Sequence, residues 1–108
     1  MSSVLPYQLT VTVPSHLMSK AEVDSAIGLL TRQHGGVTIV GGRGMWADDD
    51  GEFVVEPVQV LTWWSVTEPD PTNLCIMLLR AGEKAVLYER GPYGARIVTR
   101  DDYPGYFS

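Results

Sequence analysis

The glycine-rich segment GGRGMWADDDGEF, residues 41–53, comes closest to a ligand-binding motif. Gly41, Gly42 and Gly44 could cradle a phosphate, but a dinucleotide fingerprint needs a helix directly after its glycine turn. MWADDDG and a strand follow instead, and the Gly-Lys-Ser/Thr of a Walker loop is absent. A backbone nest that binds an anion with the help of Arg43 stays open, beside the alternative of a bulged or strongly twisted strand.

The three aspartates before Gly51 resemble a calcium-binding loop in composition only. Asp48, Asp50 and Gly51 would occupy positions three, five and six of such a loop. Its first and last ligands would then be Trp46 and Pro57, and neither offers a side-chain oxygen. Asp-Gly between two apolar arms is a signal for a β-hairpin. We therefore predict a solvated hairpin turn here, and neither a metal site nor a cofactor.

The two histidines and the single cysteine are the remaining candidates for chemistry. His34 falls in the last turn of a predicted helix, where positive charge is favourable, and His16 lies before that helix. A Ser-His-Asp arrangement cannot be assembled from the sequence alone, so catalysis by His16 or His34 stays an alternative. Cys75 lies in the apolar run NLCIMLLRA, which predicts a buried, inert thiol.

Composition limits the partners of the chain. The 108 residues carry a net charge of −5, which argues against a binder of duplex nucleic acid, because such proteins present a basic surface. Six of the eight basic residues are Arg, which suits bidentate recognition of a compact anion. No apolar run is long enough to span a membrane and no signal peptide is visible, so we expect a cytoplasmic protein, of the host cell if the chain is viral.

These residues must be positioned by strands and two helices. YQLTVTV, residues 7–13, alternates as a half-buried strand does. Residues 18–36 repeat apolar side chains at helical spacing, with a capping box at Ser19 and Glu22 and a stop at Gly35.

A second helix is predicted over residues 68–82, with Asp70 as N-cap and Pro71 as its first residue. The other strands are predicted in the runs GVTIV, EFVVEPVQVLTWWSV, KAVLYER and ARIVTR. The order β-α-β-β-α-β, with a further strand at the end, indicates an α+β ferredoxin-like sandwich, mostly antiparallel, with two helices on one face. We expect one domain over residues 1–100 and a loose tail over 101–108.

The adjacent Trp63 and Trp64 indicate a second buried or binding surface. Neighbours on a strand point to opposite faces, and only one face can meet the helices. The other face would then expose a large aromatic side chain, a feature typical of interfaces. We predict a subunit or ligand interface that includes Leu61, Trp63, Trp64 and Tyr88, without assigning which tryptophan faces the core. The alternative is that the C-terminal segment folds over this face within one chain.

About half of the chain resembles a group of small ferredoxin-like proteins of unknown function from bacteria and phages. The resemblance rests on Gly-Val-Thr, Gly-x-Trp, a glycine turn, a glutamate, and a Gly-Gln-x-Ala/Ser-Val strand entry. The matching positions are Gly36, Val37, Thr38, Gly44, Trp46, Gly51, Glu56 and Gly82 to Val86, with Glu83 where that group has Gln. The resemblance implies the fold and supplies no catalytic residues.

These patterns together favour a non-catalytic, homo-oligomeric binding protein. We expect a phage or mobile-element accessory protein of the counter-defence kind, which sequesters a small anion such as a signalling nucleotide. Its predicted ligand contacts are Gly41, Gly42, Arg43, Gly44, Arg90 and Arg96. The alternatives are a stoichiometric inhibitor of a host protein and a small ferredoxin-like enzyme that uses His16 or His34.

Overall fold

The structure is a computed structural model that describes residues 4–107. Five strands and two α-helices follow the predicted order, which is therefore confirmed. The elements are β1 (Tyr7–Pro14), α1 (Ala21–His34), β2 (Thr38–Ala47), β3 (Phe53–Ser65), α2 (Thr72–Arg80), β4 (Val86–Gly91) and β5 (Gly94–Val98), with the short 3-10 turns η1 (Ser15–Leu17) and η2 (Arg100–Asp102).

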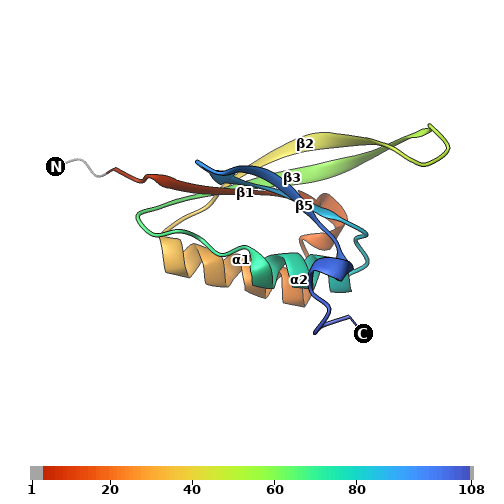
Figure 1. The fold of residues 1–108 in the computed structure, drawn as a ribbon. Helices are drawn as coiled ribbons and strands as arrows, with labels where there is room; N and C mark the ends of the chain where they lie inside the picture. Colours follow the sequence, from red (N-terminus) through yellow and green to blue (C-terminus); the bar gives the residue numbers. More distant parts are fainter. Residues whose placement is uncertain (1–3, 108) are drawn as a thin grey trace.

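The five strands form one antiparallel sheet in the order β2-β3-β1-β4-β5. Both helices lie on the same face of the sheet, and no element of the described chain covers the opposite face (Figure 1). The predicted α+β ferredoxin-like arrangement is confirmed. We call the uncovered side the open face, because it decides where a ligand can approach the sheet.

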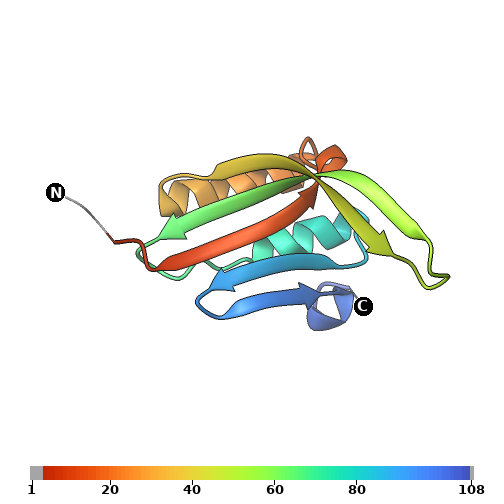
Figure 2. The same ribbon diagram turned by 90° about the horizontal axis from the view of Figure 1, so that it is seen from above.

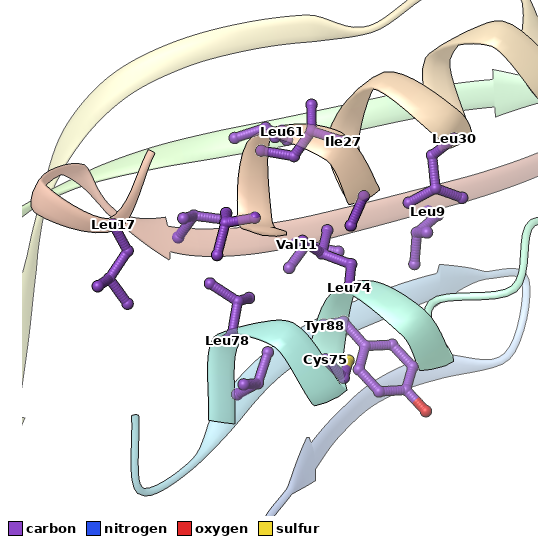
Figure 3. Close-up of a cluster of buried hydrophobic side chains, with 14 of the residues drawn as sticks. Leu9, Val11, Leu17, Ile27, Leu30, Leu61, Leu74, Cys75, Leu78 and Tyr88 are labelled. Atoms are coloured by element: carbon purple, nitrogen blue, oxygen red, sulfur yellow. The ribbon is translucent and has the colours of Figure 1, made fainter. Parts of the chain in front are cut away.

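The core lies between the sheet and the two helices (Figure 3). Leu61 and Trp63 point from β3 into it and are fully buried, and Tyr88 is nearly so. Trp63 lies between β3 and α1 and donates its indole N–H to Thr31 Oγ1 at 3.1 Å. Leu61, Trp63 and Tyr88 therefore cannot form the predicted subunit interface, since they are the interior of the monomer. Trp64 points the other way and is 50% exposed.

The helix ends agree only in part with the sequence signals. Gly35 ends α1 in the left-handed conformation, with φ 91°, as predicted. The capping box of Ser19 and Glu22 is wrong, because α1 begins at Ala21 and Lys20 occupies the cap position without a side-chain bond. α2 begins at Thr72 with Pro71 in the cap position, one residue later than predicted. The carboxylate of Asp70 still accepts the backbone N–H of Thr72 at 3.0 Å.

The β2–β3 hairpin is the most extended part of the molecule. The predicted strand GVTIV and the predicted hairpin arm GMW belong to one strand of 10 residues, which begins at Thr38. Each of its residues pairs with one residue of the β3 segment from Phe53 to Thr62. The outer half of the hairpin twists away from the body of the sheet (Figure 2). We call this outer half, residues 43–57, the arm. It stretches the molecule to 53 Å in its longest dimension.

The C-terminal segment, expected to be loose, packs back onto α2. Tyr103 and Phe107 contact the core, and Arg100 donates to the carbonyl oxygen of Leu79 at 2.9 Å.

Burial raises the pKa of the Cys75 thiol to about 12, so this thiol stays protonated and unreactive, as predicted. Ser108 lies outside the described residues. No helix within residues 4–107 has the length and apolar character to cross a membrane.

Candidate functional site

A cavity of about 310 Å³ opens on the open face of the sheet, near the end of β1. This volume is at the lower end of the range for small-molecule sites. Apolar side chains provide most of its wall, with one carboxylate among them. The lining residues are Thr12, Pro14, Met45, Trp46, Val58, Glu83, Ala85, Leu87 and Ile97.

Residues of the arm form one wall of this cavity. β2 and β5 are the two opposite edges of the sheet. Met45 and Trp46 of β2 nevertheless line the same cavity as Ile97 of β5. The twist of the hairpin therefore brings these two β2 residues to the cavity that Ile97 also lines, and the sheet surface is concave there.

Trp46 forms the aromatic wall of the cavity and rests on Gly44. The two residues are two positions apart on β2, so their side chains point to the same face. Gly44 is the only buried residue of β2, and the ring atoms of Trp46 occupy the space above it. The indole is 44% exposed, so one part of its surface is available to a ligand.

Glu83 brings a carboxylate to this apolar site. Burial raises the pKa of the Glu83 carboxyl, the nearby carboxylate of Glu56 raises it further, and His16 acts in the opposite direction. Desolvation disfavours the charged form, so a cation that enters the cavity would relieve this cost. The cavity is thus suited to a ligand with an apolar or aromatic body and a positive charge.

The predicted anion nest is not formed. Gly41, Gly42, Arg43 and Gly44 lie in the extended strand β2 and pair with β3 in regular register. Successive amides of a strand point to opposite sides, so they do not converge on one anion. Arg43 lies opposite Pro57 and does not line the cavity.

The structure brings Arg90 and Arg96 together, far from the glycines of β2. They line a separate cavity of about 290 Å³ with Tyr88 and Tyr93, at the β4–β5 side of the sheet. Arg90 forms an ion pair with Glu68, and its guanidinium lies 5.8 Å from the centre of the Tyr93 ring. The six predicted ligand contacts therefore belong to two opposite edges of the sheet and not to one site.

The histidines are also separated from one another. His34 Nδ1 lies 2.7 Å from Ser65 Oγ, and that oxygen also accepts the backbone N–H of Thr67 at 3.1 Å. Ser65 is buried, so this contact holds the end of α1 against β3. His16 is exposed on η1, close enough to Glu83 to influence its pKa.

The sequence reasoning did not select Trp46 or Glu83 as site residues, although a signal was present. Gly44 with Trp46 is one of the segments that carry the resemblance described above. The segment from Gly82 to Val86, which contains Glu83, is another. In the fold these two segments, distant in sequence, meet at the same cavity.

Two solved structures share this fold. A phage SAM lyase in complex with S-methyl-5'-thioadenosine aligns with a TM-score of 0.60 and 13% sequence identity, over 92% of this chain and 93% of that chain. A phage SAM lyase in the apo state aligns with a TM-score of 0.62, again at 13% identity, over 92% of this chain and 95% of that chain. No family model matches the sequence, and no curated protein matches it.

This likeness corrects the expected function. The sequence favoured a non-catalytic protein that sequesters a small anion. Its alternatives were a host-protein inhibitor and a small ferredoxin-like enzyme that uses His16 or His34. The fold is instead shared, over nearly the whole of both chains, with a phage protein that is named as a lyase. The resemblance to small phage proteins holds at the level of fold, whereas no family model supports the group itself.

Proposed function

We propose that the chain is an enzyme that binds an S-adenosyl sulfonium compound in the open-face cavity and cleaves a carbon–sulfur bond. The observation that carries the proposal is an apolar cavity with an aromatic wall and a carboxylate, Trp46 and Glu83, in a fold shared with a phage SAM lyase. S-adenosylmethionine has the matching chemistry, since it joins an aromatic adenine to a positively charged sulfur.

The charge of the sulfonium is what the site would recognise. A unit charge within about 4 Å of a carboxylate gains about 4 kcal/mol at the effective dielectric constant of a partly buried site. A cation on the face of a tryptophan gains about 0.5–2 kcal/mol more. Glu83 and Trp46 line the same cavity, so one sulfonium could contact both. This preference for a cation replaces the anionic ligand that the sequence suggested.

The reaction would break the bond between the sulfonium sulfur and the γ-carbon of the amino-acid chain, without water. Sulfur keeps the bonding pair and leaves as neutral S-methyl-5'-thioadenosine, so the leaving group needs no proton. The four-carbon fragment either gives a β-proton to a base and becomes an alkene, or closes on its own carboxylate and becomes a lactone. Glu83 is the candidate base for the first route, while the second route requires only orientation of the substrate.

The partner that we propose is thus a small molecule of the cytoplasm, and no duplex nucleic acid.

We also propose that a second copy of this chain packs against the arm. Several large apolar side chains of the arm are exposed, including Phe53 at 71% and Met45 at 61%. Exposed apolar surface of this kind marks an interface.

Turnover of S-adenosylmethionine tests the proposal. We expect the purified protein to release S-methyl-5'-thioadenosine, measured by liquid chromatography and mass spectrometry. Glu83→Gln should lower the rate about 100-fold or more, the usual effect of removing a positioned charged or acid–base group. Glu89→Gln is the matched control, because Glu89 is an exposed strand glutamate that does not line the cavity.

A substrate with deuterium at the β-carbon separates the two routes. Loss of one deuterium from the four-carbon product indicates elimination by a base, and full retention indicates closure to the lactone. Absence of any S-methyl-5'-thioadenosine from the wild-type protein, at enzyme concentrations comparable to the substrate, would contradict the proposed function.

A further inference from the structure

The contact between Gly44 and Trp46 leaves no space for a side chain at position 44. A Cβ atom built on Gly44 would lie 1.8 Å from Cζ3 and 1.9 Å from Cη2 of the indole. These distances are far below any non-bonded contact, so the ring could not keep its place beside even an alanine. The bare backbone of Gly44 is therefore the surface on which the indole rests.

The neighbouring glycine on the same face does not share this property. A Cβ atom on Gly42 would meet only Cγ2 of Val58, at 3.8 Å, which is an ordinary van der Waals contact. Gly42 and Gly44 belong to the same strand and differ by two positions, so both point to the open face. The need for glycine is thus specific to position 44, and it arises from the tryptophan and not from the backbone of the strand.

We propose that Gly44 is a positioning residue that seats the Trp46 indole as the charge-selective wall of the cavity. This inference rests on the proposed function, and it names the feature by which the site distinguishes substrate from product. The sulfonium substrate carries a positive charge that the ring face attracts, whereas the thioether product carries none. Cleavage therefore removes the attraction, and the product leaves.

The size of this selectivity follows from the strength of a cation–π contact. A gain of about 0.5–2 kcal/mol corresponds to a preference of about 2- to 30-fold for the cation. The Glu83 carboxylate in the same cavity adds its own preference for positive charge. The part that depends on Trp46 should vanish when the ring is displaced, while the part due to Glu83 should remain.

Two ligands that differ in charge and cannot be cleaved at the sulfonium provide the test. Sinefungin carries an ammonium group where the sulfonium would be, and S-adenosylhomocysteine carries a neutral thioether. Calorimetry gives the ratio of their dissociation constants for each variant. We expect the wild type and Gly42→Ala to prefer sinefungin, and Gly44→Ala and Trp46→Leu to lose about 2- to 30-fold of that preference.

The position of the ring can be read without any ligand. Acrylamide quenching of Trp46 fluorescence, after subtraction of the signal of Trp46→Phe, should increase in Gly44→Ala and stay unchanged in Gly42→Ala. Trp46→Leu, which keeps Gly44, gives the same binding test if Gly44→Ala fails to fold.

Three outcomes separate the inference from the proposed function. If the wild type converts S-adenosylmethionine but Gly44→Ala and Trp46→Leu keep the full preference for sinefungin, the function stands and the inference is overturned. Equal quenching changes in Gly42→Ala and Gly44→Ala would overturn the positioning role. If the wild type neither converts S-adenosylmethionine nor binds either ligand, the proposed function fails, and the charge selectivity with it.

Discussion

At the scale of single residues, Glu83 affects both the stability of the fold and the proposed reaction. Its carboxyl has a pKa above the ordinary value, chiefly because of burial. The folded protein therefore holds this proton more tightly than the unfolded chain. The stabilising contribution is complete below the ordinary pKa of 4.5 and is lost as pH rises through the raised value. At neutral pH, the ionised carboxylate lowers the stability of the fold.

Glu83→Gln should consequently raise the melting temperature at pH 7 to 8 relative to wild type, and this difference should shrink as pH falls toward 4. The same variant should lose turnover, so stability and activity change in opposite directions. Thermal unfolding over this pH range, with Glu89→Gln as control, measures the effect. A difference between Glu83→Gln and wild type that does not vary with pH would contradict the assigned ionisation.

Residue types and spacing predicted the environment of some side chains, but not which tryptophan is buried or which residues line the cavity. The alternation of β3 established that Trp63 and Trp64 face opposite ways, but the choice of the buried one depends on where α1 packs. The Thr31 hydroxyl that receives the Trp63 N–H lies 32 positions earlier in the sequence. Glu83 was overlooked for a similar reason, since Met45 and Trp46, which line the same cavity, lie 38 and 37 positions earlier in the sequence.

At the scale of elements, the β2–β3 hairpin was predicted correctly, but the sequence did not indicate the hydrogen bonds that close its turn. Asp50-Gly51 does form the turn, and Gly51 has the predicted positive φ, 80°. The loop is longer than a two-residue turn, however, because it closes with the Asp48 N–H donating to the carbonyl of Glu52 at 2.8 Å. Asp48 was expected to be merely solvated, but its Oδ1 accepts the N–H groups of Asp50 and Glu52 at 3.0 and 2.9 Å.

We therefore expect Asp48→Ala to loosen the tip of the arm, at a cost of about 0.5–1.5 kcal/mol for each lost hydrogen bond. Gly51→Val should have a larger local effect, about 1–2 kcal/mol, because a branched residue disfavours the left-handed conformation. Amide hydrogen exchange at residues 45–55 is the suitable measurement, since the tip can open without global unfolding. Asp49→Ala is the control, and equal exchange in Asp48→Ala and Asp49→Ala would refute the role of Asp48.

At the scale of the whole molecule, the sequence predicted the fold much better than the site. Strand alternation, helical periodicity and the glycine stops are local signals, and they were enough for the order of elements and the two-layer arrangement. The cavity is not local, because it joins residues of β1, β2, β3, β4 and β5 on a face that no helix within residues 4–107 covers. The glycines of β2 were mistaken for an anion site because the sequence does not show that Gly41, Gly42 and Gly44 pair along a regular strand, nor that the Trp46 ring packs on Gly44.

The arm also carries the prediction about assembly. Its exposed side chains include Met45, Phe53, Val54 and Val55, and apolar surface on a projecting hairpin is costly to leave in water. If a second copy covers this surface, the protein should sediment as more than a monomer at micromolar concentration. Phe53→Ser should shift it toward monomer without changing its circular dichroism. Val66→Ser is the control, because Val66 is also apolar and is exposed at 63% but lies outside the arm. A wild-type protein that sediments as a monomer at tens of micromolar would contradict the proposed assembly through the arm.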